Sequence, residues 1–211
     1  MTSTLCAEDL RTEALPTLYG DVVAVLRDGG IAVLRPLDAG EVAPQVAVLE
    51  RMSDESRWQR FLTAMPAQLP RSAQEALAAI DGRRHVAWLA SVDGCPAGVA
   101  RSVEYEPGTA EVAFEVVDAH HGRGIGSLLL EAVTTVAAFH GVRRLSATVH
   151  PGNHASVRLL HHVGVRLRAV DGLLEGTSEL RLPTPTRLDR AAVLAAQAGR
   201  RGGLGAGAVA G

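Results

Sequence analysis

The strongest constraint on the fold is a glycine-rich segment, residues 121–126, with the sequence His-Gly-Arg-Gly-Ile-Gly. A strand-like segment over residues 110–117 precedes it, in which apolar and more polar side chains alternate. From Ile125 onward, apolar residues recur at i, i+3, i+4, i+7 and i+8, which predicts an amphipathic helix that ends at Gly141. The chain must therefore place a strand, a tight glycine turn and a helix in direct succession.

The segments around this motif predict a mixed sheet covered by helices. Three strands before the glycine loop are joined by tight turns and should form an antiparallel meander. After the loop the order changes to helix, strand, helix and a closing hairpin. Asp38 and Ser53 are the expected N-caps of the first two long helices. The expected helices cover residues 22–26, 39–51, 53–62, 72–80, 125–141, 153–163 and 186–198, and the strands cover residues 31–35, 85–92, 98–106, 110–117, 144–149, 165–170 and 173–182.

The length of 211 residues fits one domain with a substantial core. We expect an N-terminal extension over residues 1–28, a folded domain over 29–183 and a C-terminal tail over 184–211. The end of this tail is rich in glycine and alanine, so we expect it to be partly disordered.

The glycine loop has the chemistry of an anion-binding site. Glycines let successive backbone N–H groups point at one place, and the helix N-terminus adds roughly half a positive charge there. A nucleoside-triphosphate loop needs a lysine, and this chain has none. A dinucleotide loop needs Gly-x-Gly-x-x-Gly in a parallel unit, whereas here the spacing is Gly-x-Gly-x-Gly after antiparallel strands. A glycine turn that binds nothing stays as the alternative.

Composition excludes several other classes. The net charge of −2 offers no basic face for a nucleic acid. No run of about 18 apolar residues predicts a membrane span, and the start of the chain lacks the layout of a signal peptide. Two cysteines, Cys6 and Cys95, are too few for a disulfide framework, so we expect a cytoplasmic protein without nucleic-acid or membrane partners. The histidines do not converge at ligand spacing, so we expect no metal.

Two motifs together resemble the GNAT family of N-acetyltransferases. The glycine loop stands where this family has Gln/Arg-x-x-Gly-x-Gly/Ala, with His121 at the Gln/Arg position. Downstream, Asn153 and Ser156 match an Asn-x-x-Ala/Ser motif that the family often has. The resemblance covers about residues 31–182. It implies an α+β (α/β) fold with a central mixed, mostly antiparallel sheet of about six to seven strands, splayed between the fourth and fifth strands, and about four helices.

The resemblance also implies that acetyl-CoA binds as co-substrate in the wedge of the splayed sheet. Backbone groups of Val116 and Val117 would pair with the pantetheine arm like an added strand. The amides of residues 122–127 would hold the pyrophosphate, and Asn153 would contact the pantetheine or cap its helix. The cofactor-binding residues expected in this way are Val116, Val117, His121, Gly122, Arg123, Gly124, Ile125, Gly126, Ser127, Asn153 and Ser156.

Acetyl transfer to an amine needs a base, a polarised thioester carbonyl and a stabilised leaving thiolate. Glu111 is the expected general base, because it lies on the strand where protein-lysine acetyltransferases of this family place a glutamate. Glu115, on the same strand face, is the second candidate, and a solvated charge or an ion pair with arginine is the alternative for either. The backbone N–H near Val116 would polarise the carbonyl. Leu160 stands where many members have a tyrosine, so the general acid stays unassigned.

The acceptor is the least constrained part of the function. Residues 52–61 resemble the N-terminal part of bacterial protein-lysine acetyltransferases that modify acyl-CoA synthetases. We therefore expect transfer to a primary amine, a protein lysine such as one on an acyl-CoA synthetase. Two alternatives stay open, namely acetylation of a small-molecule amine and a non-catalytic acetyl-CoA sensor. Whether the chain forms a homodimer is also left open.

Overall fold

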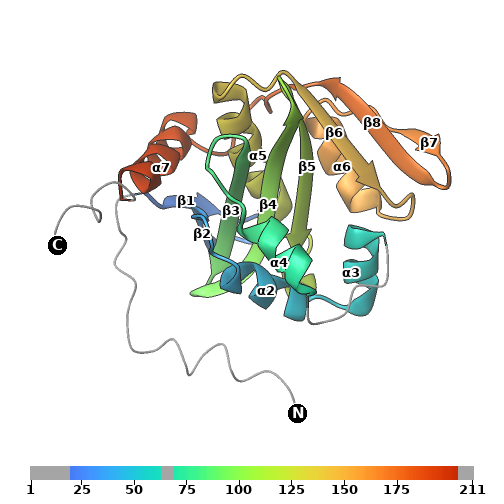
Figure 1. Cartoon of the computed structure of the whole chain (residues 1–211). Coiled ribbons are helices and arrows are strands. Elements are labelled where there is room, and N and C mark those ends of the chain that lie inside the picture. Colours follow the sequence, from blue (N-terminus) through green and yellow to red (C-terminus); the bar gives the residue numbers. More distant parts are fainter. Residues whose placement is uncertain (1–19, 63–68, 204–211) are drawn as a thin grey trace, which may run out of the picture.

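The computed structural model describes residues 20–62 and 69–203, and one sheet runs through this part of the chain (Figure 1). The strands are β1 (Val22–Val25), β2 (Ile31–Pro36), β3 (His85–Val92), β4 (Cys95–Glu106), β5 (Thr109–Val116), β6 (Arg144–Val149), β7 (Arg168–Val170) and β8 (Leu173–Glu179). The helices are α2 (Ala43–Glu50), α3 (Asp54–Phe61), α4 (Arg71–Ala78), α5 (Ile125–Phe139), α6 (His154–His162) and α7 (Arg190–Gly203), with a 3-10 turn η1 (Asp118–His120). The sheet order is β1-β2-β3-β4-β5-β6-β8-β7.

The edge strand β1 corrects the helix expected around residues 22–26. Its residues alternate between buried and exposed, and three of the four are valine, whose branched side chain suits a pleated sheet. Strand β1 pairs antiparallel with β2, with Val22 opposite Leu34. In the turn between them, the Gly30 N–H donates to Asp28 Oδ1 at 3.2 Å. Pairing with a neighbouring strand, which a short apolar run does not reveal, decides the conformation here.

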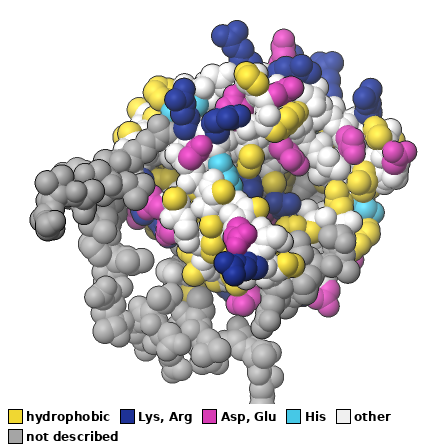
Figure 2. Space-filling model, viewed as in Figure 1, with side chains coloured by type: hydrophobic (Ala, Val, Ile, Leu, Met, Phe, Trp, Pro, Cys, Tyr) yellow, Lys and Arg dark blue, Asp and Glu magenta, His cyan; other side chains and the backbone are white. Residues whose placement is uncertain are grey.

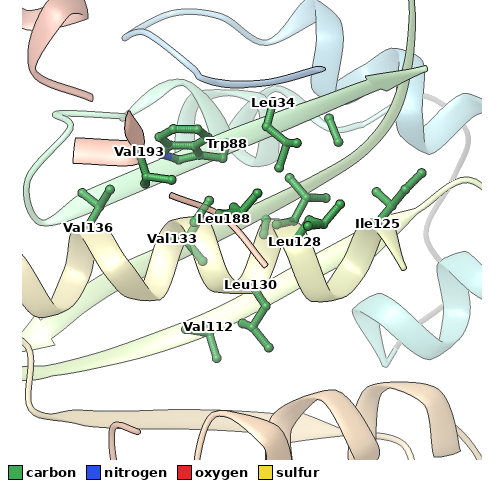
Figure 3. Packing of buried hydrophobic residues seen from close by; sticks show 14 of the residues in the cluster. Leu34, Trp88, Val112, Ile125, Leu128, Leu130, Val133, Val136, Leu188 and Val193 are labelled. Carbon is green, nitrogen blue, oxygen red and sulfur yellow. The ribbon is translucent and has the colours of Figure 1, made fainter. Parts of the chain in front are cut away.

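The two faces of the sheet bury separate apolar clusters. Helices α5 and α7 lie on one face, where Trp88, Leu128 and Val193 belong to the larger cluster (Figure 3). Helix α2 lies against the other face, where Leu89 and Val99 belong to the smaller cluster. Trp88 and Leu89 are neighbours on β3 and join different clusters, as the two-residue period of a strand requires.

Helix α7 is a full member of the core. It corresponds to the helix expected over residues 186–198. Its Val193 is fully buried, and Gln197 Oε1 accepts a hydrogen bond from Trp88 Nε1 at 2.9 Å. The division into an extension, a domain over 29–183 and a tail stays a prediction, but β1 and α7 lie outside that range and both bury apolar side chains in the core.

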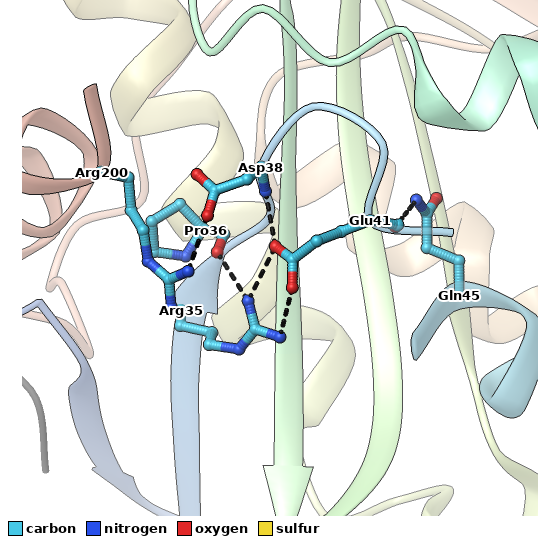
Figure 4. A network of polar contacts seen from close by, with 6 residues as sticks. All are labelled: Arg35, Pro36, Asp38, Glu41, Gln45 and Arg200. Atoms are coloured by element: carbon cyan, nitrogen blue, oxygen red, sulfur yellow. Dashed lines mark hydrogen bonds and ion pairs between the residues drawn. The ribbon is translucent and has the colours of Figure 1, made fainter. Parts of the chain in front are cut away.

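A polar network ties α7 to the loop after β2 (Figure 4). Arg200 Nη1 donates to Asp38 Oδ2 at 2.8 Å, and Arg35 donates to both carboxylate oxygens of Glu41 at 2.9 and 3.1 Å. Burial raises the pKa of Glu41, but the hydrogen bonds from Arg35 and the Asp38 N–H outweigh burial and lower that pKa. The cap expected at Asp38 is wrong, since α2 begins at Ala43 without a side-chain cap and Asp38 binds Arg200 instead.

The parallel pair β5–β6 opens the sheet. Three residue pairs join these strands, the last being Glu111 with Ser146, although β5 continues to Val116 and β6 to Val149. The strands therefore diverge beyond Glu111 and leave a wedge. This confirms the expected mixed, mostly antiparallel sheet with a splay at this position. The described residues form eight strands and six helices, where we expected about six to seven strands and about four helices.

Figure 2 shows acidic and basic side chains interspersed over the face seen in Figure 1, with several basic side chains along its upper edge. In the part of the chain that the structure describes, every helix is too short or too polar to cross a bilayer.

Candidate active site

A cavity of about 580 Å³ lies in the wedge between β5 and β6. Its walls come from these strands, the glycine loop, the first turns of α5 and α6, and helix α3. Most of the expected site residues line it, whereas Val117 and Arg123 do not. The expected residues that line the cavity are Glu111, Val116, His121, Gly122, Gly124, Ile125, Gly126, Ser127, Asn153 and Ser156. The fold thus gathers residues from separate elements into one site.

The glycine loop presents the N-terminus of α5 to this cavity. Gly122 and Gly124 have φ angles of +78° and +96°, which residues with a Cβ rarely adopt. Gly124 is the N-cap of α5 and no side chain caps the helix. The first N–H groups of α5 therefore keep the hydrogen-bonding capacity that an anion requires. A Cβ at Gly126 would lie 3.0 Å from a methyl carbon of Leu159, so space is short at the third glycine as well.

Two residues that we expected to contact the cofactor, Val117 and Arg123, bind other groups of the protein instead. The Val117 side chain is buried in the cluster next to α2, and its N–H donates to the Ala97 carbonyl at 2.9 Å. Arg123 donates through Nε to Asp28 Oδ2 at 2.5 Å and through Nη1 to His120 Nδ1 at 2.8 Å. Burial, followed by the charge of Arg123, lowers the pKa of His120, which agrees with a neutral ring that accepts this hydrogen bond. The Arg123 guanidinium, which we expected to contact the cofactor, therefore binds Asp28 and His120 instead.

His121 contacts the strand expected to hold the pantetheine arm. Its Nε2 atom donates to the Val116 carbonyl oxygen at 2.9 Å. The Val116 carbonyl and the Val117 N–H belong to one peptide unit and point in opposite directions. Because the Val117 N–H donates to Ala97 on β4, the Val116 carbonyl points away from β4 and towards the wedge. The edge of β5 that a pantetheine amide would pair with therefore faces the cavity next to the glycine loop.

The two glutamates of β5 lie in different environments. Glu111 is exposed where β5 and β6 diverge. The Glu115 side chain is only 1% exposed, and its carboxylate binds Arg60 Nε at 2.8 Å and Arg101 Nη2 at 3.0 Å. Burial raises the pKa of Glu115, but the charges of Arg60 and Arg101 outweigh burial and lower that pKa. Glu115 is therefore committed to ion pairs, whereas Glu111 is open to the cavity and to solvent.

Helix α3 forms one wall of the cavity and buries none of its own residues. Its N-cap is Ser53, as expected, and the Ser53 Oγ accepts from the Ser56 N–H at 3.2 Å. Asp118, just after β5, accepts from the Ser53 N–H and from both serine hydroxyls at 2.7 to 2.8 Å. Next to β6, the rings of Trp58 and His150 meet edge to face with centroids 4.5 Å apart. Polar and aromatic contacts hold this wall.

The start of α6 forms the wall on the other side of the wedge. Asn153 Oδ1 accepts from the Ser156 N–H at 3.0 Å, so Asn153 caps this helix while it lines the cavity. Leu160 is 2% exposed and also lines the cavity. No tyrosine lines the cavity among the described residues, so the position of a general acid stays unassigned.

Sequence reasoning gave no role to three charged residues that hold the walls of this site, namely Arg60, Arg101 and Asp118. Arg60 lies in the segment 52–61 that resembles protein-lysine acetyltransferases, and Asp118 follows β5 closely, so both lie next to features that the sequence does indicate. Arg101 carries no sequence signal, because only the register of β4 and β5 brings it to Glu115. Among the described residues, no three His, Cys, Asp or Glu side chains cluster in a way that could hold a metal ion.

Comparison with known proteins identifies the family. Residues 49–165, more than half of the chain, match the acetyltransferase (GNAT) family. The acetyltransferase Pat of Mycolicibacterium smegmatis is 30% identical over 143 residues, which cover 66% of this chain and 42% of that protein. This chain therefore spans less than half the length of that curated relative. The chain therefore belongs to the acetyltransferase (GNAT) family.

Solved structures agree with this assignment. The GNAT domain of PAT from S. lividans is 31% identical, with a TM-score of 0.69, and the match covers 76% of this chain and 97% of that domain. A GNAT-superfamily phosphinothricin acetyltransferase from Sinorhizobium meliloti, solved in complex with acetyl-CoA, has a TM-score of 0.56 at 20% identity, with 75% and 93% of the two chains covered. The second likeness concerns the fold alone. The expected family and its closeness to bacterial Pat-type acetyltransferases are confirmed.

Proposed function

We propose that this enzyme transfers the acetyl group of acetyl-CoA to a primary amine, with Glu111 as general base and a protein lysine as acceptor. One observation carries the proposal. Glu111 is exposed at the fork between β5 and β6, and it lines the same cavity as the uncapped N-terminus of α5. A donor whose phosphates bind the loop can therefore extend along β5 and bring its acyl end towards a carboxylate.

Three features support acetyl-CoA as the donor. The glycine loop offers free backbone N–H groups to a pyrophosphate. The Val116 carbonyl, next to the loop, can accept a hydrogen bond from a pantetheine amide in the manner of an added strand, if His121 shares or yields it. A structural relative, the Sinorhizobium meliloti enzyme, was solved with acetyl-CoA.

The proposed reaction needs one proton transfer before the acyl transfer. Glu111 removes a proton from the acceptor ammonium, and the neutral amine attacks the thioester carbon. Backbone N–H groups of β5 near Val116 stabilise the oxyanion that forms. The carbon–sulfur bond then breaks, and the nitrogen of the new amide gives its second proton to solvent. The CoA thiolate takes a proton from solvent, because Leu160 has none to give. Glu115 is unsuited to the role of base, since two arginines hold its carboxylate.

The role of Glu111 is tested by Glu111→Gln, which keeps the shape of the side chain and removes its basicity. We expect thiol release from acetyl-CoA to fall by at least about 100-fold, the size typical for loss of a general base, while the Kd for CoA stays unchanged. Glu179→Gln is the matched control, because Glu179 is also exposed but lies on β8 and does not line the cavity. Equal rates for Glu111→Gln and the wild type would exclude Glu111 as the base.

The lysine acceptor is supported by the likeness to bacterial Pat acetyltransferases and by the wall that α3 builds. Three residues of this helix line the cavity, namely Ser56, Gln59 and Phe61. All three lie within residues 52–61, the segment that resembles protein-lysine acetyltransferases. We would compare an acyl-CoA synthetase, its lysine-to-arginine variant and a panel of small amines as acceptors. Transfer to the synthetase alone, lost in its variant, is the expected outcome.

Two other outcomes would replace this proposal. Faster transfer to a small amine than to any protein would establish a small-molecule acetyltransferase. Binding of acetyl-CoA without consumption of any acceptor would favour a sensor that binds the cofactor without catalysis.

A further inference from the structure

Two segments that are far apart in the sequence meet at the glycine loop. From the β1–β2 turn, the Arg27 N–H donates to the Arg123 carbonyl at 3.0 Å. From the segment before α7, Arg187 donates through Nη1 to the Gly124 carbonyl at 3.4 Å and through Nη2 to the Val25 carbonyl at 3.2 Å. A Cβ at Gly124 would lie 2.7 Å from Nη1 of Arg187, so this glycine also makes room for the guanidinium.

A buried carboxylate fixes the backbone of Arg187 in this place. Glu131 on α5 is 2% exposed, and its carboxylate accepts from the N–H of Arg187 at 3.1 Å and from the N–H of Leu188 at 3.3 Å. Leu188 packs in the core with Val193 (Figure 3). Because a buried carboxylate is costly unless hydrogen-bonded, these contacts commit Glu131 to holding the segment. The Arg187 side chain, in contrast, is exposed beside the loop.

The charges at the loop favour Arg27 and Arg187 over Arg123 as partners for an anion. Arg123 is neutralised by Asp28 at 2.5 Å. Arg27 lines the cavity, and its guanidinium forms no ion pair within residues 20–62 and 69–203. In the same residues Arg187 donates only to carbonyl groups, which leave its charge uncompensated. Two uncompensated positive charges thus flank the loop.

We propose that Arg27 and Arg187 supply the positive charge that holds the phosphate groups of CoA at this loop. Backbone N–H groups serve the pyrophosphate, but CoA also carries a 3′-phosphate, and such a dianion is best matched by guanidinium groups. Arg27 contacts a phosphate from the cavity wall. Arg187 is a positioning residue that braces the Gly124 carbonyl and adds to the local field. The proposal rests on the proposed function, since it takes CoA as the ligand.

Both arginines lie outside residues 49–165, the part of the chain that matches the family. The test is calorimetric titration with CoA and with 3′-dephospho-CoA, which requires no acceptor. It compares the wild type with Arg27→Gln, Arg187→Gln and the double variant. Arg168→Gln is the matched control, because Arg168 is exposed on the short strand β7 at the far edge of the sheet.

Each single variant is expected to raise the Kd for CoA on the order of tenfold, the double variant by more, and Arg168→Gln by less than about twofold. Added NaCl should weaken CoA binding more steeply in the wild type than in the double variant. Arg27→Lys and Arg187→Lys, which keep the charge, should retain most of the affinity. A loss that disappears with 3′-dephospho-CoA assigns the contact to the 3′-phosphate, and a loss that persists assigns it to the pyrophosphate.

An unchanged Kd in the double variant, or an equal loss in Arg168→Gln, would overturn the inference. Thermal unfolding checks that each variant is folded, and the lysine variants remain informative if a glutamine variant is not. A wild type that fails to bind CoA at low salt would instead refute the proposed function, so the two failures are distinguishable.

Discussion

Arg60 Nε lies 2.8 Å from Glu115 Oε2, and this ion pair joins helix α3 to the strand that carries the proposed base. Arg101 binds the other oxygen of the same carboxylate at 3.0 Å from β4. Glu111 and Glu115 lie on the same face of β5 four residues apart, yet one is solvent-exposed and the other is the centre of a buried ionic cluster. The environment, rather than the residue type, separates a candidate base from a structural carboxylate.

Glu115→Gln should destabilise the protein strongly. The substitution leaves Arg60 and Arg101 without their shared partner, and Arg101 is itself buried. Loss of one member of a buried ion pair costs about 3 to 5 kcal/mol, so the free energy of unfolding should fall by about 3 kcal/mol or more in urea titrations. Glu75→Gln is the control, since Glu75 forms an exposed pair with Arg71 and its loss should cost less than about 0.5 kcal/mol. Equal small losses would show that the buried cluster contributes little.

The same carboxylate should make the fold sensitive to acid. Burial raises the pKa of Glu115 and the two arginines lower it further than burial raises it, so its pKa in the folded state lies below the usual 4.5. Its stabilising contribution is therefore present above pH 4.5 and is lost as the pH falls through the lower folded-state pKa. Urea titrations between pH 7 and pH 3 should show a steeper loss of stability in the wild type than in Glu115→Gln. Parallel curves would contradict this assignment.

Asp118→Asn should loosen helix α3 with little effect on the cofactor. Burial raises the pKa of Asp118, but hydrogen bonds from Ser56 and Ser53 outweigh burial and lower it, so the charged form is the one that holds the helix. We expect faster amide hydrogen exchange in residues 54–61 and a KM for the acceptor raised severalfold, while the Kd for CoA stays the same. Ser53→Ala should weaken the same attachment and cost about 1 kcal/mol of stability through the lost cap. Unchanged exchange in α3 in both variants would show that other contacts hold the helix.

Leu188→Ala should destabilise the protein through the segment that leads into α7. Leu188 is 4% exposed in the main core cluster, and truncation of a buried leucine costs about 2 to 5 kcal/mol. Val23→Ala on β1 is the control, because Val23 is 56% exposed and should lose less than about 0.5 kcal/mol. Both values come from denaturant unfolding. A cost for Leu188→Ala as small as that of the control would mean that the segment before α7 is not part of the cooperative fold.

Local sequence was sufficient to predict most of the fold. The strand alternation, the glycine spacing and the helical stripe after Ile125 are encoded in neighbouring residues, so the meander, the loop and α5 could be predicted. The resemblance to one family added the splay between β5 and β6 and pointed to Glu111. Local encoding failed at β1, where four residues are too few to distinguish helix from strand without the partner strand β2.

The tertiary structure alone decided the charge arrangement of the site. Arg123 stands in the motif but binds Asp28 of a distant turn, whereas Arg27 and Arg187, more than 150 residues apart, are brought to the same loop. Arg101 reaches Glu115 only through strand register. The physical reason is that hydrogen bonds and packing within a motif act over a few residues and leave a sequence pattern. Ion pairs between distant segments depend on where the whole fold places each side chain, so no local sequence pattern predicts them.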